Sequence, residues 1–297
     1  MPGQLTRKAI ATQPEWLAQV PGRIGDRRLP AGAHVLFTGC GTSFHAALAC
    51  GNAAQALELV LGNAPDADVL VAISHEGGTA LTLEAVKGFS GETWLITGKE
   101  DSALAKAVDH VVVAAPELEE SYCHTASYTC AVAAGRALRG EDVDGLANQV
   151  FRELDAEPLD VSEHQRFVVA GAGSDVGTVL EAVLKLREGA HVAAEAHQTE
   201  QLLHGHLAAI DPSVRCFVLE GEGRAAERAV DAMRALGELG CDALLVPTTH
   251  PVVDIVRFQR LACDLAEARG IDPDLIRWDE APWDRARKAQ DFTAADQ

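Results

Sequence analysis

The sequence predicts an α/β protein in which two parallel sheets, each flanked by helices, follow one another behind an N-terminal helix. Short runs of apolar, β-branched residues alternate with longer segments whose apolar residues recur at helical spacing. This alternation occurs once in each half of the chain. It is typical of parallel sheets covered by helices on both faces, because the strands of such sheets are continuously apolar.

The expected elements begin with a helix within Met1–Asp26, where we expect Pro14 to interrupt the helix or to start a new one. In the first half we expect strands over His34–Thr38, Asp68–Ile73, Thr93–Thr97 and His110–Ala114, and helices over Ser43–Leu61, Thr79–Gly88 and Ser102–Ala107. In the second half we expect strands over Arg166–Ala170, Arg215–Leu219 and Ala243–Pro247, and helices over Val176–Ala196, Arg224–Leu239 and Ile255–Arg269.

The two halves resemble each other. A strand followed by Gly-x-Gly ends at Gly39 and Gly41, and the same pattern returns 132 residues later at Gly171 and Gly173. We infer a tandem duplication, in which the second copy carries extra residues rich in His and Glu. The predicted division is a helical segment (1–29), a first domain (30–140), a linker (141–158), a second domain (159–270) and a tail (271–297).

The composition excludes several classes of protein. The 297 residues include 44 acidic and 25 basic ones, a formal net charge of −19, and 47% are apolar. The apolar fraction excludes a wholly disordered chain. The acid excess argues against nucleic acid and anionic lipid as partners, because both require basic patches. No apolar stretch reaches the ~20 residues of a membrane span, and residues 1–15 lack the apolar region of a signal peptide.

The cysteines suggest a compartment. Seven are present, scattered and without a C-x-x-C pair. This usage fits buried thiols in a reducing cytoplasm better than a disulfide framework or a zinc site.

Three hydroxyl-rich loops follow expected strands, at the sheet edge where α/β proteins bind ligands. They are Gly39–Ser43, Ser74–Thr79 and Ser121–Thr129. A Gly-x-Gly turn before a helix presents backbone amides to an anion. The alternative for the first loop is a tight turn with Ser43 as helix N-cap. A dinucleotide site is disfavoured, because Phe44 stands where its fingerprint requires a third glycine.

In the second half, Glu181, Lys185 and Glu188 share one helix face, since they are spaced by four and three residues. The alternative to a catalytic role is a pair of ordinary surface ion pairs. His204 follows in a Leu-His-Gly-His context. The histidines of this region lack the spacing of a metal site, so we expect no metal and no other cofactor.

Together these motifs resemble the sugar isomerase (SIS) family. They are Gly-Cys-Gly-Thr-Ser at 39–43, Ser74-x-x-Gly-x-Thr79, Glu181-x-x-x-Lys185-x-x-Glu188 and His204-Gly. Within this family the motifs resemble the isomerase half of glucosamine-6-phosphate synthase and the tagatose-6-phosphate ketose/aldose isomerases. The resemblance covers nearly the whole chain and implies two tandem SIS domains with flavodoxin-like sheets, assembled as a homodimer that shares its active sites.

The resemblance also implies residue roles. Glu188 would be the base that moves a proton between C1 and C2, with Lys185 near the reacting end. His204 would come from the partner subunit and assist ring opening. The remaining substrate contacts would be phosphate binding by Ser43, Ser74 and Thr79, a sugar contact from Thr125, and further contacts from Gly41, Thr42, His75, Glu76 and Glu181. Proton transfer through an enediol or enolamine requires one carboxylate and one acid/base group, and no redox cofactor.

Three departures from the family pattern qualify the substrate. Glu76 stands where a hydroxyl residue is usual, and a carboxylate beside a phosphate is repelled. The tail has no lysine at the position of the synthase's C-terminal lysine. Pro2 replaces the cysteine of a glutaminase domain, so we expect no glutamine-dependent amination.

The leading hypothesis is therefore an isomerase of sugar phosphates or a deaminase of aminosugar phosphates. The alternatives are the same chemistry on a sugar that is not phosphorylated or is differently charged, and a non-catalytic sugar-binding sensor.

Overall fold

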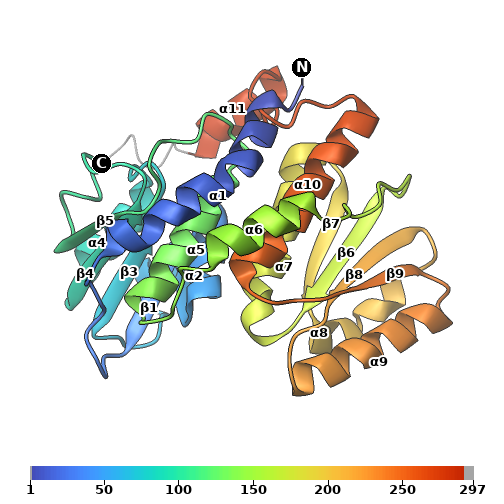
Figure 1. The fold of residues 1–297 in the computed structure, drawn as a ribbon, viewed down its shortest axis with the longest axis horizontal. Helices are drawn as coiled ribbons and strands as arrows, with labels where there is room; N and C mark the ends of the chain where they lie inside the picture. Colours follow the sequence, from blue (N-terminus) through green and yellow to red (C-terminus); the bar gives the residue numbers. More distant parts are fainter. Residues whose placement is uncertain (1, 291–297) are drawn as a thin grey trace.

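Two parallel sheets organise the computed structural model, which describes residues 2–290 (Figure 1). The first sheet has the order β2-β1-β3-β4-β5, formed by Ala53–Gln55, Val35–Gly39, Val69–Ile73, Glu92–Thr97 and His110–Val113. The second has the order β7-β6-β8-β9, formed by Ala193–Gln198, Arg166–Gly171, Val214–Leu219 and Asp242–Val246. All pairings are parallel, so the predicted α/β class is confirmed.

Eleven α-helices connect and cover these strands within the described residues. They are α1 (Gln4–Ile24), α2 (Thr42–Cys50), α3 (Ala56–Val60), α4 (Ala80–Gly88), α5 (Ala126–Leu138), α6 (Leu146–Asp155), α7 (Val176–Ala190), α8 (Thr199–Leu203), α9 (Arg224–Glu238), α10 (Pro251–Arg269) and α11 (Ala281–Gln290). Short 3₁₀ turns lie at Gly173–Asp175 and His206–Ala209.

A layer of helices lies between the sheets. Helices α1, α5, α6, α7 and α10 cross the middle of the molecule, with the first sheet on one side and the second on the other (Figure 1). The largest apolar cluster includes side chains from both sheets, such as Phe37, Val71, Phe167 and Phe217. The two sheets share the same relative strand order, but their core is continuous, so the division into tandem domains stays a prediction.

The N-terminal helix corrects one expectation. Helix α1 runs unbroken from Gln4 to Ile24 and contains both Pro14 and Pro21. Each proline removes one helical N–H. The helix continues because its buried face, which includes Trp16 and Val20, packs against α5 and α6.

Two expected helices were too long. Residues 43–61 form α2, then strand β2, then α3, because Gly51 takes a φ of 154° and ends α2. Residues 176–196 form α7 and then strand β7, with His191 at a φ of 52° between them. Both unpredicted strands pair with the first strand of their sheet.

Smaller corrections concern three other segments. Residues 102–107 form turns instead of a helix. The predicted linker contains α6, which packs on α1 and α10. The predicted tail contains α11, and residues 291–297 lie outside the described part of the chain. Among residues 2–290, no helix combines the length and apolar character needed to cross a bilayer.

Candidate functional site

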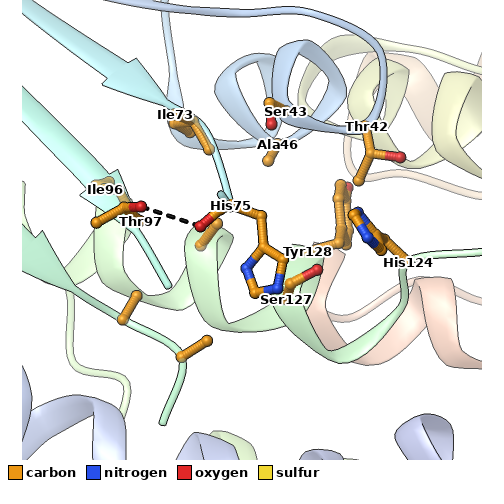
Figure 2. A pocket seen from close by; sticks show the side chains of 13 residues that line it. Thr42, Ser43, Ala46, Ile73, His75, Ile96, Thr97, His124, Ser127 and Tyr128 are labelled. Carbon is orange, nitrogen blue, oxygen red and sulfur yellow. Dashed lines mark hydrogen bonds between the residues drawn. The ribbon is translucent and has the colours of Figure 1, made fainter. Parts of the chain in front are cut away.

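A pocket opens at the carboxyl ends of the first sheet's strands (Figure 2). Its polar wall consists of Thr42, Ser43, His75, Thr97, His124 and Ser127. Its apolar wall includes Ala46, Ile73, Ile96, Tyr128 and Ala131. The predicted edge of the sheet therefore carries a pocket whose polar groups come from the three predicted loops and from Thr97 at the end of β4. Neither lysine nor arginine lines it.

The first loop delivers the start of α2 to the pocket. An added Cβ at Gly39 would lie 2.8 Å from the carbonyl carbon of Ser43, and Gly41 has a φ of 54°. Only glycine fits a turn this tight. The N-cap residue of α2 is Gly41, with no side-chain cap. The alternative in which Ser43 caps the helix is thus wrong, and its side chain instead lines the pocket.

The second loop divides its residues between the interior and the surface. Ser74 is buried, and its Oγ lies 3.3 Å from Oγ1 of Thr79, the N-cap residue of α4. Glu76 is exposed and is absent from the pocket wall. The Glu76 carboxylate therefore lies outside the pocket, and any repulsion between it and a bound anion acts from there.

Several contacts fix the position of His75 in the pocket wall. Its Nε2 accepts a hydrogen bond from the backbone N–H of Glu119 at 3.0 Å, and the Thr97 hydroxyl donates to its carbonyl at 3.0 Å (Figure 2). Its ring lies edge-on to His124, with centroids 5.2 Å apart. Burial, and then the His124 imidazole, lower the pKa of His75 to about 4.

Glu119, which sequence reasoning missed, occupies the start of α5. Its carboxylate accepts hydrogen bonds from the backbone N–H groups of Thr125, Ala126 and Ser127, at 2.6, 3.2 and 2.9 Å. Burial opposes this charge, but His124 and these hydrogen bonds prevail and lower the pKa of Glu119. The chain's own carboxylate thus fills the anion-binding end of this helix.

Thr125 belongs to the same arrangement. It is fully buried, and its hydroxyl donates to Glu119 at 2.8 Å. Its expected contact with a sugar stays a prediction, since the hydroxyl already has a partner.

The Glu/Lys face of α7 meets the first loop across the boundary between the two halves. Lys185 Nζ lies 2.6 Å from Glu188 Oε2, 3.4 Å from Glu181 Oε1 and 3.4 Å from Thr42 Oγ1. The Thr42 hydroxyl donates to Glu181 Oε1 at 3.2 Å. Residues about 140 positions apart in sequence therefore share one polar cluster, which touches the pocket wall through Thr42.

This cluster is not a surface ion pair. Glu181 and Lys185 are 0% and 1% exposed, whereas the Glu188 side chain is 23% exposed at the open end. Burial disfavours the Lys185 ammonium, but the carboxylates of Glu181 and Glu188 prevail and hold the pKa of Lys185 well above its usual value. The alternative of two ordinary surface pairs is wrong.

His45 is a second residue that sequence reasoning missed. Its Nδ1–H donates to Glu181 Oε2 at 2.8 Å. The contact depends on the close approach of α2 and α7, where a Cβ added at Gly177 would lie 2.8 Å from both the Ala49 nitrogen and the His45 oxygen. Only the tertiary fold reveals this pairing.

His204 lies apart from the cluster. Its side chain is 69% exposed, and its Nδ1 lies 3.0 Å from both the carbonyl and the carboxylate of Glu200. Within residues 2–290, no set of three His, Cys, Asp or Glu side chains could hold a metal ion.

Comparisons with curated sequences and with solved structures both find similar proteins. A scan against protein-family models finds no match. The glutamine–fructose-6-phosphate aminotransferase (isomerizing) of Aeropyrum pernix is 28% identical over 91% of this chain and 54% of its own length. That of Methanothermobacter thermautotrophicus is 28% identical over 81% of this chain and 50% of its own. The chain thus spans about half the length of the curated relatives it matches.

Solved structures resemble it over nearly its whole length. The C-terminal domain of glucosamine-fructose-6-phosphate aminotransferase from Francisella tularensis has a TM-score of 0.76 at 19% identity, covering 91% of this chain and 98% of that one. Glucosamine-6-phosphate deaminase from Thermotoga maritima gives 0.73 at 24%, covering 92% and 97%. Tagatose-6-phosphate ketose/aldose isomerase from Escherichia coli gives 0.75 at 16%, covering 93% and 97%. This chain has the fold of the phosphosugar isomerases.

Proposed function

We propose that the protein belongs to the SIS family, as two tandem SIS domains, and isomerises a sugar phosphate or deaminates an aminosugar phosphate. The observation that carries the proposal is the Glu181–Lys185–Glu188 cluster, packed against Thr42 beside the pocket. Burial of charged groups costs desolvation free energy, so a buried ion cluster beside a pocket is a candidate functional site. The similar proteins include an isomerizing aminotransferase, a deaminase and an isomerase of phosphosugars, and the cluster suits chemistry of this kind.

In this proposal Glu188 is the base. It is the one carboxylate of the cluster with an exposed fraction, 23%, and so the one that a substrate can reach. It takes the proton from C2 of an open-chain aldose and returns it to C1 through an enediol. In the deaminating case the same transfer passes through an enolamine to a ketimine at C2, which water hydrolyses to the ketose and ammonia. Lys185, held cationic, stabilises the negative charge that develops on the substrate oxygen.

The anionic end of the substrate would lie at the start of α2. Ser43 lines the pocket there, and the Ser74 and Thr79 hydroxyls, which do not line it, lie 3.3 Å from each other in the second loop. Helix N-termini bind phosphate without a formal positive charge nearby. Such a site suits a protein with a net charge of −19 and a pocket wall without lysine or arginine.

His204 would act in the active site of a partner subunit. Its exposure on the surface of its own subunit is what such a role requires. A mixture of Glu188→Gln and His204→Ala variants tests this, because subunit exchange would restore a fraction of native sites.

All seven cysteines are free, which supports a cytoplasmic location.

The test of the function is direct. The protein is incubated with fructose-6-phosphate, glucosamine-6-phosphate, galactosamine-6-phosphate and tagatose-6-phosphate, and sugar products and ammonia are followed. We expect turnover of at least one, and a loss of about 10³-fold or more in Glu188→Gln. Glu238→Gln, an exposed change on α9, is the matched control and should remain active. No turnover, or full activity in Glu188→Gln, would reject the proposal.

A second candidate is the same chemistry on a sugar without phosphate. The exposed Glu76 favours it, because a carboxylate in the loop that would bind the phosphate repels an anion. Under this alternative Glu76→Ser would weaken native activity. Under the first proposal, the same change would strengthen binding of the phosphosugar because it removes a negative charge.

A further inference from the structure

The two carboxylate oxygens of Glu181 have different partners. Oε2 receives the Nδ1–H of His45 at 2.8 Å, from α2. Oε1 receives the Thr42 hydroxyl at 3.2 Å and faces Lys185 Nζ at 3.4 Å. Because a carboxylate only accepts hydrogen bonds, His45 must carry its proton on Nδ1. His45 thus holds one side of a fully buried carboxylate whose other side faces the cluster.

Lys185 is shared unequally between the two glutamates. It lies 2.6 Å from Glu188 and 3.4 Å from Glu181. Glu181 is the more deeply buried of the two, so without another partner its charge would attract the ammonium more strongly. The His45 hydrogen bond satisfies part of that charge and leaves Lys185 closer to Glu188.

His45 shares its groove with three other charged or titratable residues, Arg187, Glu195 and His197. It lines an open groove formed with Leu180, Val183, Leu184 and Arg187 of α7 and with Glu195 and His197 of β7. Glu195 pairs with His197 at 3.3 Å. The one direct ionic partner that the structure gives His45, within residues 2–290, is therefore Glu181. The imidazole does not line the substrate pocket.

We propose that His45 is a positioning residue, which anchors Glu181 and thereby directs Lys185 to Glu188. The inference rests on the proposed function, in which Glu188 is the base. Loss of the imidazole lets Lys185 move toward Glu181. Glu188 then loses its fixed orientation, and it binds a proton more readily because the ammonium has withdrawn.

Two variants separate this role from mere packing. His45→Ala removes the donor, whereas His45→Asn can place an amide N–H near the position of Nδ1–H. On the substrate that wild type turns over, we expect His45→Ala to lower kcat about tenfold, with KM changed less than about threefold, and to move the acidic limb of the kcat–pH profile to higher pH. In His45→Asn we expect kcat and the position of the acidic limb to return to their wild-type values. His164→Ala, in the loop that precedes β6, is the matched control.

Crystal structures of the two variants give a readout that does not depend on activity. We expect Lys185 to approach Glu181 in His45→Ala and to stay on Glu188 in His45→Asn. If Lys185 keeps its position in His45→Ala, or if His45→Asn behaves like His45→Ala, the inference is overturned. If wild type turns over no sugar, the proposed function fails, and the structures alone decide whether His45 directs Lys185.

Discussion

The backbone N–H of Glu119 donates to Nε2 of His75, which fixes the imidazole proton on Nδ1. Protonation of Nε2 would replace an accepted hydrogen bond by two N–H groups that face each other. Burial and the nearby His124 act in the same direction, and the pKa of His75 falls to about 4. The pocket wall therefore presents a neutral imidazole at physiological pH.

This arrangement predicts a specific weakness in acid. The folded protein binds the His75 proton less readily than the unfolded chain, whose histidines titrate near 6.5. The contribution of His75 to stability is thus present above pH 6.5 and is lost as the pH falls toward about 4, by about 3 kcal/mol at most. We expect His75→Gln to flatten the fall of Tm over this range, and His164→Gln to leave it unchanged. Parallel curves for wild type and His75→Gln would contradict the prediction.

Glu119 should carry a measurable share of the stability. Glu119→Ala leaves three backbone N–H groups and the Thr125 hydroxyl without their acceptor. We expect a loss of about 2–4 kcal/mol in the free energy of unfolding in urea, and a smaller loss in Glu119→Gln, which keeps one accepting oxygen. The control is Glu120→Gln, since Glu120 forms an exposed pair with Lys8 that contributes less than about 1 kcal/mol. Similar losses at positions 119 and 120 would show that the cap contributes little.

The sequence was sufficient for the longer strands and for placing Glu181, Lys185 and Glu188 on one face of α7. Residues 69–73 are continuously apolar, residues 214–219 are apolar apart from Arg215, and both segments form buried strands, as predicted. The edge strands β2 and β7 were missed. Ala53–Gln55 and Ala193–Gln198 contain no β-branched or aromatic residue, and they form strands because a neighbouring strand offers them hydrogen bonds.

The missed site residues have a similar cause. His45 gains its role from Glu181, 136 positions away, and no local pattern marks such a pair. Glu119 caps a helix that begins seven residues later, outside the spacing of any standard capping motif. Helix periodicity placed Glu181, Lys185 and Glu188 on one face, but only the packing of α7 on α2 shows that this face is buried.

The contact between α2 and α7 can be tested through a pair of glycines. A Cβ at Gly177 would press on the backbone of α2, so Gly177→Ala should separate the helices, cost about 1–3 kcal/mol and weaken any activity that depends on Thr42 and Lys185. Gly237, in α9, has open space where a Cβ would be, so Gly237→Ala should stabilise the protein by about 0.5–1 kcal/mol. Chemical denaturation of both variants provides the measurement. If Gly177→Ala is as stable as Gly237→Ala, the helices can separate without cost and the cluster does not depend on their close packing.

A carboxylate beside the second sheet should lower stability as the pH rises, whereas His75 lowers it as the pH falls. Asp175 stands 132 residues after Ser43, at the matching place in the second Gly-x-Gly loop. It is 5% exposed, and its Oδ2 has no hydrogen-bond partner within the described chain. Burial, and then the charge of Glu222, raise the pKa of Asp175 to about 6.

The stability associated with the neutral carboxyl is present below 3.8, the pKa of Asp175 in the unfolded chain. It is lost as the pH rises through about 6, by about 3 kcal/mol at most. Asp175→Asn stays neutral, so it should gain stability over wild type between pH 4 and pH 7, whereas the exposed Asp144→Asn should not. A constant difference in Tm between Asp175→Asn and wild type across this range would mean that the Asp175 carboxylate has a partner when charged, and the second loop would then have to be considered a binding site.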